Sequence, residues 1–168
     1  MLRLRPYCDS DACEIVKWIG DERLFRLWSA DRYDKWPVTA EDINRQYAGR
    51  INSDAFFPMT AYDEEGIKGH LIIRFTDSEK KTARFGFVIV DSSVRGKGYG
   101  REMLLLAMKY AFEMLLVDKV TLGVFDVNEK AERCYRSVGF VRSEEQPGEK
   151  FSLNNGEMWT CIELEITK

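Results

Sequence analysis

The sequence predicts one α/β domain over residues 1–168, with a mixed, mostly antiparallel central sheet and helices on both of its faces. Three observations support this fold class. A length of 168 residues suits a single domain with a sizeable core. Apolar residues (45%) and charged residues (32%) occur in the proportions of an ordinary globular protein. Strand-like and helix-like segments alternate, and three consecutive strands in the middle favour an antiparallel meander.

The first half of the chain predicts a strand, a group of helices and a hairpin. The expected elements are a strand at 2–6, helices at 11–19, 22–30 and 39–51, and strands at 56–62 and 67–75. Asp11 and Thr39 stand at helix starts, and each has an acidic residue three positions later, as in a capping box. The segment DEEG at 63–66 predicts the turn between the two strands.

The second half of the chain alternates strands with helices. The expected elements are a strand at 84–90, a helix at 99–116, a strand at 119–126, a helix at 129–138, and strands at 140–145 and 157–166 joined by a loop. Gly139 is the expected C′ residue of the second of these helices. A helix between the strands at 84–90 and 119–126 predicts that these two strands are parallel neighbours.

Composition excludes several classes of protein. A net charge of −3 argues against a dedicated nucleic-acid binder. Four cysteines without a C-x-x-C pair, and a single histidine, argue against a metal site and against a disulfide framework. The N-terminus lacks the apolar core of a signal peptide, and no apolar run is long enough to span a membrane. We therefore expect a cytoplasmic protein with reduced thiols.

The segment 95-RGKGYG-100 is the strongest functional signal in the sequence. It follows an expected strand and opens an expected helix, where unpaired backbone N–H groups and the helix dipole favour an anion. Glycines allow the backbone to wrap closely around a phosphate. A Walker A loop does not fit, because Arg101 and Glu102 follow instead of Lys and Ser or Thr. A dinucleotide fingerprint would need glycine at position 101, and the remaining alternative is a tight turn that binds nothing.

The spacing Arg95-x-x-Gly98-x-Gly100 resembles the pyrophosphate-binding motif of the GNAT superfamily of acetyl-CoA-dependent N-acetyltransferases. The runs 88-VIVDSSVRGKGYG-100 and 120-VTLGVFDVNEKAERCYRSVGF-140 are also similar to that superfamily, as is the opening LRLRPYCDSDA. Within it, the sequence looks most like the branch that contains the ribosomal-protein N-terminal acetyltransferases (RimJ/RimL-like). The resemblance covers nearly the whole chain.

The resemblance implies a set of acetyl-CoA-binding residues. The backbone of the strand would hold the pantetheine arm, the loop amides would hold the diphosphate, Lys97 or Arg101 would reach a phosphate, and Asn128 would bond the pantetheine arm. The residues implied are Val88, Ile89, Val90, Arg95, Gly96, Lys97, Gly98, Tyr99, Gly100, Arg101 and Asn128. Simpler alternatives are core packing for the strand, surface charge for the basic residues, and helix capping for the asparagine.

The resemblance also implies that Tyr135 is the general acid that protonates the departing CoA thiolate; a core tyrosine is the alternative. The general base is unassigned. Related enzymes often carry a glutamate early on the fourth strand, where this chain has Arg84 or Phe85. Asp126 is a candidate base, with an exposed strand-end carboxylate as the favoured alternative. His70 is the only imidazole, and a structural role is favoured for it.

The sequence thus predicts an N-acetyltransferase in which a primary amine attacks acetyl-CoA directly in a ternary complex. The acceptor is a small-molecule amine or a protein N-terminus, with no metal, nucleic acid or membrane involved. A non-catalytic sensor of CoA or acyl-CoA with the same fold is the alternative, and a nucleotide enzyme is a third reading of the loop. The exposed edge formed by the final strands is consistent with a homodimer or with a bare edge.

Overall fold

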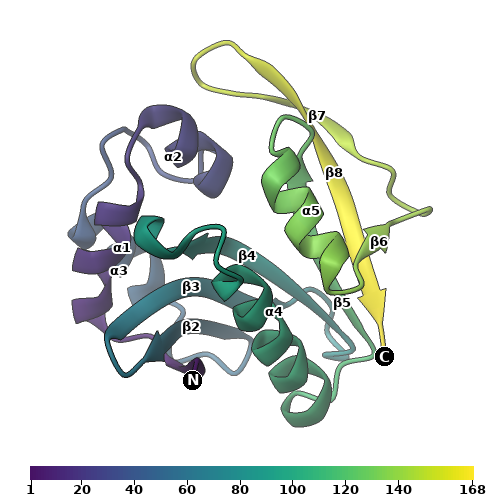
Figure 1. Ribbon diagram of the computed structural model, residues 1–168. Coiled ribbons are helices and arrows are strands. Elements are labelled where there is room, and N and C mark those ends of the chain that lie inside the picture. The colour runs from purple at the N-terminus through teal and green to yellow at the C-terminus, as the bar shows by residue number, and fades with distance from the viewer.

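The computed structural model describes all 168 residues, Met1–Lys168, and its centre is one eight-stranded sheet (Figure 1). The strands are β1 Arg3–Pro6, β2 Phe56–Asp63, β3 Gly66–Phe75, β4 Thr82–Val90, β5 Lys119–Phe125, β6 Val141–Arg142, β7 Glu149–Ser152 and β8 Met158–Thr167. Their order across the sheet is β1-β2-β3-β4-β5-β8-β6, and β7 also pairs with β8.

Every neighbouring pair of strands is antiparallel except β4 and β5, as the sequence predicts. The parallel pairing is short, because only residues 82–84 of β4 face residues 119–121 of β5. Beyond this point the two strands have no common ladder. The sheet therefore opens between β4 and β5 toward the C-terminal end of both strands.

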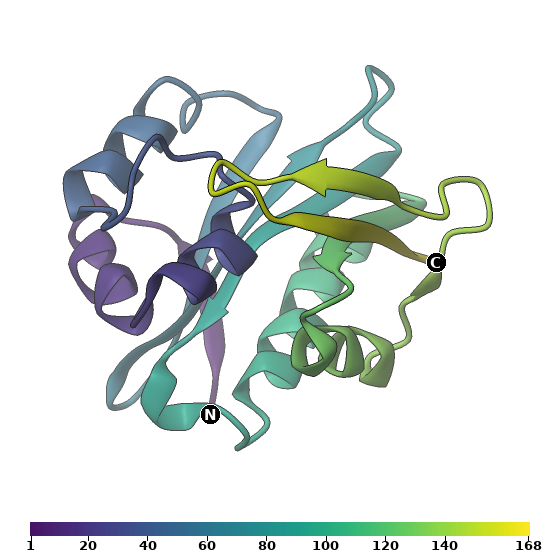
Figure 2. The same ribbon diagram turned by 90° about the horizontal axis from the view of Figure 1, so that it is seen from above.

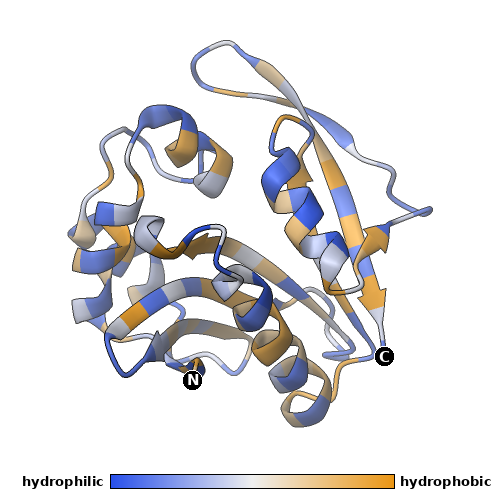
Figure 3. Ribbon diagram, in the orientation of Figure 1, coloured by the Kyte–Doolittle hydropathy of each residue, from blue (hydrophilic) through white to orange (hydrophobic).

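The helices cover both faces of the sheet (Figures 1 and 2). They are α1 Ala12–Trp18, α2 Glu22–Ser29, α3 Ala40–Ala48, α4 Tyr99–Lys109 and α5 Glu129–Ser137. The helices α4 and α5 share one apolar core with the sheet, and α1, α2 and α3 share a second core with the opposite face. Hydrophobic and hydrophilic residues alternate along much of β8 (Figure 3), where Ile162 and Leu164 enter the core beneath α4 and α5 and Trp159 enters a small third core.

The strand β4 contributes to both cores because it contains a β-bulge. Ala83 and Phe85 belong to the core beneath α4, whereas Phe87 and Ile89 belong to the core beneath α1–α3. Regular alternation would place all four side chains on one face. The register against β3 shifts within this stretch, and Phe87 has a φ of 48°, in the left-handed region. The extra residue therefore reverses the facing of the strand after Gly86.

Several boundaries differ from those that the sequence predicts. The helix expected at 99–116 is α-helical only to Lys109, and Tyr110–Met114 forms a π-helical turn in which the Leu115 amide bonds the Tyr110 carbonyl. The expected strand at 140–145 is reduced to the two residues of β6, and β7 forms inside an expected loop. None of the helices has the length and apolar character needed to cross a bilayer.

Asp11 anchors β1 and the start of α1 instead of capping the helix with its side chain. Its buried carboxylate accepts two hydrogen bonds of 2.8 Å from Arg5, one of 2.7 Å from the Thr60 hydroxyl and one of 3.0 Å from the Cys8 amide. Burial by itself raises the pKa of Asp11, but the hydrogen bonds from these donors outweigh it, so the pKa lies below its ordinary value.

We expect Asp11→Ala to lower the free energy of unfolding at pH 7 by about 3 kcal/mol, because it breaks a buried ion pair and leaves Thr60 without a partner. Urea denaturation measures this loss. The pKa of Asp11 is lower in the folded state than in the unfolded state. The stabilisation by Asp11 is therefore fully present above the unfolded pKa and is lost as the pH falls through the folded pKa. The exposed Glu14–Lys17 pair supplies a control, because Glu14→Ala should cost about 0.5 kcal/mol. Equal losses in the two variants would contradict the prediction.

Candidate active site

The candidate active site is the opening between β4 and β5, which has helices α4 and α5 on one side of the sheet and α2 on the other (Figure 1). On the α2 side the opening contains a cavity of about 100 Å³. Its walls come from α2 and the residues that follow it, and from β3, β4 and β5; they are Leu27, Trp28, Ala30, Arg32, Ile72, Arg74, Arg84, Phe85, Gly86, Phe87, Gly123 and Phe125. The cavity is therefore apolar with three arginines.

The glycine loop lies where β4 ends and α4 begins. Gly98 is the N-cap of α4 with a φ of 89°, and Gly96 has a φ of 77°, so both adopt a backbone conformation that favours glycine. The backbone amides of Gly96, Gly98, Tyr99, Gly100 and Arg101 donate no hydrogen bond within the protein. These amides and the positive end of the helix dipole form a potential site for a phosphate.

The side chains of the loop divide into two groups. Arg95 donates to the Trp18 carbonyl at 2.7 Å and to the Val90 carbonyl at 3.3 Å, so it fixes the loop against α1 and β4. The Tyr99 hydroxyl donates to Asp63 at 3.1 Å. Lys97 and Arg101 are exposed and form no ion pair within the protein. Their charges are therefore available to an anion.

The strand residues Val88, Ile89 and Val90 pack in the cores, and their role in binding stays a prediction. The side chains of Val88 and Val90 pack against the α4 core and that of Ile89 packs in the opposite core, while no strand pairs with their backbone on the β5 side. Asn128 caps α5, since its Oδ1 accepts from the Ala131 amide at 3.4 Å. Its side-chain NH₂ has no partner within the protein, so capping leaves these donors available.

Tyr135 lies on α5 and packs in the apolar core that α4 and α5 share with the sheet, with 8% of its surface exposed. Burial raises the pKa of its phenol above the ordinary value of 10, so the group is protonated at neutral pH. The hydroxyl makes no hydrogen bond within the protein. The neighbouring Cys134 approaches α4, because a Cβ on Gly100 would lie 3.5 Å from its Sγ and 3.8 Å from Val90. The structure thus brings α5, the first turn of α4 and the end of β4 together.

The two candidate bases lie elsewhere. The Asp126 carboxylate accepts from the Thr160 amide of β8 at 3.1 Å, on the side of β5 away from β4, and its role as a base stays a prediction without a contact to support it. His70 is fully buried and its Nε2 bonds the Tyr47 hydroxyl at 2.8 Å. Burial lowers the pKa of His70 to about 3, in agreement with the structural role favoured for it.

Two features of the opening were missed in the sequence. The first is the bulge at Phe87, whose carbonyl accepts a hydrogen bond of 2.9 Å from the buried indole N–H of Trp28. The second is a bridge in which Arg84 crosses β5 and binds Glu163 of β8. Gly123 makes the crossing possible, because a Cβ there would lie 2.9 Å from the Arg84 guanidinium. Gly123 was the only signal of this bridge in the sequence.

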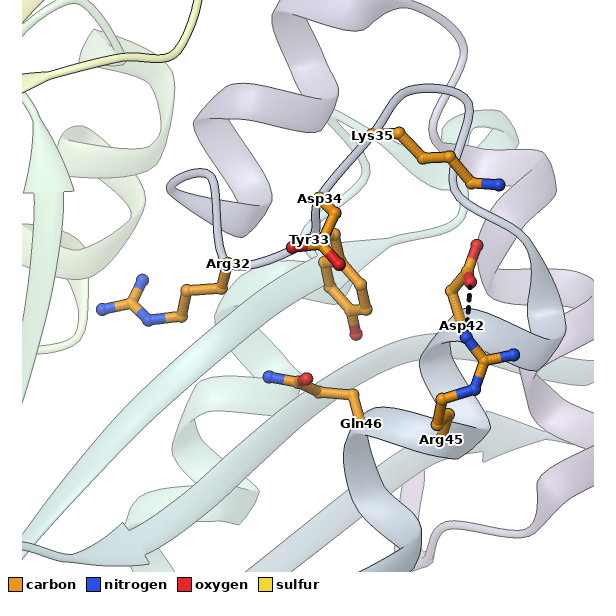
Figure 4. A pocket seen from close by; sticks show the side chains of 7 residues that line it. All are labelled: Arg32, Tyr33, Asp34, Lys35, Asp42, Arg45 and Gln46. Atoms are coloured by element: carbon orange, nitrogen blue, oxygen red, sulfur yellow. Dashed lines mark hydrogen bonds and ion pairs between the residues drawn. The ribbon is translucent and has the colours of Figure 1, made fainter.

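A larger hollow of about 420 Å³ lies beside the opening, over the segment between α2 and α3 (Figure 4). It is lined by Arg32, Tyr33, Asp34, Lys35, Asp42, Arg45 and Gln46, none of which comes from β4 or β5. Arg32 points away from the ion pair of Asp42 and Arg45, and it also lines the small cavity. Of these two hollows, the small cavity is the one that residues of β4 and β5 line, so it is our candidate for the acceptor site.

Comparison with known proteins agrees with this geometry. Residues 22–140, more than half of the chain, match the model of the acetyltransferase (GNAT) family. The chain belongs to this family. A relative is the uncharacterized prophage-derived N-acetyltransferase YokL of Bacillus subtilis, which is 26% identical over 108 residues, or 64% of this chain. The match spans only 60% of YokL.

Other GNAT proteins match over nearly the whole chain. The spermidine N(1)-acetyltransferase of Escherichia coli K12 is 25% identical over 97% of this chain and 84% of its own length. Among solved structures, the spermidine N-acetyltransferase of Vibrio cholerae in complex with CoA and spermine superposes with a TM-score of 0.81. It covers 99% of this chain and 95% of its own at 22% identity, which supports the GNAT fold. These relatives do not confirm the RimJ/RimL-like branch that the sequence predicts.

We expect Trp28→Phe to lower the free energy of unfolding by about 2 kcal/mol, because the Phe87 carbonyl loses its buried donor. Urea denaturation of the purified variants measures the loss. Trp159→Phe is a matched control, since the Trp159 indole donates to the exposed carboxylate of Glu157 at 3.0 Å and water can replace it. If the control loses as much stability as Trp28→Phe, the bond to the bulge is not what stabilises this part of the site.

Proposed function

We propose that this protein is an acetyl-CoA-dependent N-acetyltransferase that transfers the acetyl group to a primary amine by direct attack in a ternary complex. The observation that supports this most strongly is the start of α4, where five backbone amides without partners meet the open side of β4. A diphosphate would accept from the amides, and the pantetheine arm would bond the edge of residues 88–90 that has no strand partner on the β5 side. Lys97 and Arg101 would add charge to the phosphate site.

In the proposed reaction the neutral amine nitrogen attacks the thioester carbonyl, and the C–S bond breaks as the C–N bond forms. Tyr135 gives its proton to the departing thiolate, and the amine loses a proton to water. The raised pKa of Tyr135 keeps this proton in place at neutral pH. Burial also raises the pKa of the Cys134 thiol, which disfavours an acyl-enzyme through that residue.

The proposal leaves two kinds of acceptor, a small-molecule amine and a protein N-terminus of the kind expected for the RimJ/RimL-like branch. The apolar cavity of about 100 Å³ favours a small molecule, because it is too narrow for several residues of a peptide. A non-catalytic CoA sensor is the alternative function. It is motivated by the Arg84–Glu163 ion pair, which lies where related enzymes often carry a glutamate base on β4.

We expect acetyl-CoA to bind the protein saturably in a calorimetric titration, with no binding of NAD or ATP. Gly98→Ala should weaken acetyl-CoA binding about tenfold, because a left-handed backbone costs a residue with a Cβ about 1–2 kcal/mol. Gly49→Ala is the control, since Gly49 has a φ of −78° and open space around it. Binding that survives unchanged in Gly98→Ala would place the diphosphate elsewhere.

We expect Tyr135→Phe to lower kcat by about 100-fold or more while retaining acetyl-CoA binding, because it removes only the hydroxyl that donates the proton. Release of the CoA thiol in the presence of an accepted amine measures kcat. Tyr110→Phe serves as the control, since Tyr110 lies at the other end of α4 beside Phe57. Unchanged turnover in Tyr135→Phe would exclude the acid role, and a wild type that binds acetyl-CoA but acetylates no amine would favour the sensor.

A further inference from the structure

Three arginines converge on the α2 side of the opening. We call this the acceptor side, because the proposed acetyl-CoA site lies on the other side, at the start of α4. Arg74 of β3 and Arg84 of β4 are direct partners across the antiparallel ladder. Arg32, from the segment after α2, joins them at the same cavity of about 100 Å³. The rest of the cavity wall is apolar or aromatic, apart from backbone.

Only one of these three charges is neutralised within the protein. Arg84 binds Glu163 through both of its terminal nitrogens and also donates to the Thr121 hydroxyl at 3.3 Å. Arg74 forms no ion pair or hydrogen bond with its side chain, and Arg32 donates only to the Ser29 carbonyl at 3.4 Å. The cavity therefore has a clear excess of positive charge.

This excess of charge opposes folding. Like charges placed directly opposite each other in an antiparallel ladder destabilise the sheet. Burial lowers the pKa of Arg74, and the nearby charges of Arg84, Arg32 and Arg50 lower it further. Apart from the Arg32 bond to the Ser29 carbonyl, the half-buried Arg74 and the exposed Arg32 have no polar partner within the protein, so both guanidinium groups are available to a bound ligand.

The arginines are separate from the proposed diphosphate site. The glycine loop lies between the open end of β4 and the start of α4. Arg84 lies at the opposite end of β4, where the strand still pairs with β5, and its side chain crosses Gly123 on the α2 face of the sheet. An anion at the arginines is thus on the acceptor side and not on the side of acetyl-CoA.

We infer that the acceptor is a small amine that also carries an acidic group, of the α-amino acid class, with its acid bound by Arg74 and Arg32 and an apolar remainder packed against Trp28 and Phe87. This inference rests on the proposed N-acetyltransferase function. Guanidinium groups bind carboxylates through paired hydrogen bonds. A polyamine would bring only positive charge to this cavity and would be repelled.

The same charges favour the reactive form of the acceptor. A positive charge beside an ammonium group lowers its pKa, so a larger fraction of the amine is neutral and able to attack. The arginines would therefore supply part of what a general base provides in other enzymes. Glu163 does not oppose this, because its carboxylate is already paired with Arg84.

The test compares amino acids with the amines that remain when the carboxylate is removed. The pairs are L-leucine and 3-methylbutylamine, L-methionine and 3-(methylthio)propylamine, and L-phenylalanine and 2-phenylethylamine, with spermidine as a polycation. We expect kcat/KM to be at least tenfold higher for the acid-bearing member of the preferred pair and spermidine to be a poor substrate. A preference for the decarboxylated amines or for spermidine overturns the inference and leaves the acetyltransferase function intact.

Calorimetry measures the binding of the same compounds to the protein alone and to the protein saturated with CoA. It tests whether the site selects a carboxylate, and it does not depend on turnover. Binding of the amino acids but not of the decarboxylated amines supports the inference even if no acetyl transfer is detected. Absence of amino-acid binding in both states overturns it. Failure of acetyl-CoA to bind is a separate result that would overturn the proposed function.

Arg74→Met and Arg32→Met test the residues. Each should raise the KM for the amino acid at least tenfold, abolish the preference within the pair, and leave the KM for acetyl-CoA unchanged. Arg50→Met is the control, because Arg50 lies over the Phe56 ring and lines neither hollow. The melting temperature of Arg74→Met should not fall, since a like charge is removed. An equal loss of kcat/KM for both members of the pair would indicate general damage and overturn the assignment.

Discussion

The short pairing of β4 with β5 is the constraint on which the site depends. Because the two strands share a ladder only at residues 82–84 and 119–121, each leaves an unpaired backbone edge as it continues toward its C-terminal end. The helices that follow these strands, α4 and α5, therefore begin on either side of one gap. The first turn of α4 and the middle of α5 come from different parts of the chain, and they approach each other at Gly100 and Cys134.

The acceptor side is held by contacts that do not involve the gap itself. Asp31 accepts from the Asn154 amide at 2.7 Å and binds Arg26 at 2.8 Å, so the tip of the β7–β8 hairpin is attached to α2. Beneath this attachment Phe125, Leu153 and Trp159 form a small third core. Two segments more than 100 residues apart are thus joined beside the cavity, whose arginines are half-buried in the case of Arg74 and Arg84 and exposed in the case of Arg32.

The parts of the fold that local chemistry determines were predictable from the sequence, including the order of the elements apart from β7, the parallel β4–β5 pair and the glycine loop that opens α4. The parts that long-range contacts determine were not. Arg84 and Glu163 are 79 residues apart, and neither has a local signal of the ion pair. The bulge at Phe87 was hidden because Gly86-Phe87 reads as ordinary strand alternation. The acid role of Tyr135 came from the resemblance and remains a prediction, as do the base and the homodimer.

Because of the bulge, β4 tolerates a change of side chain better than a change in its number of residues. Substitution at Phe87 changes one side chain, but deletion of a single residue would reverse the facing of everything that follows. Ile89 would then turn toward α4, Val88 and Val90 would turn toward α2, and the glycine loop would start from the wrong side of the sheet. We would expect lineages of this protein to keep the residue count between Arg84 and Gly98 fixed.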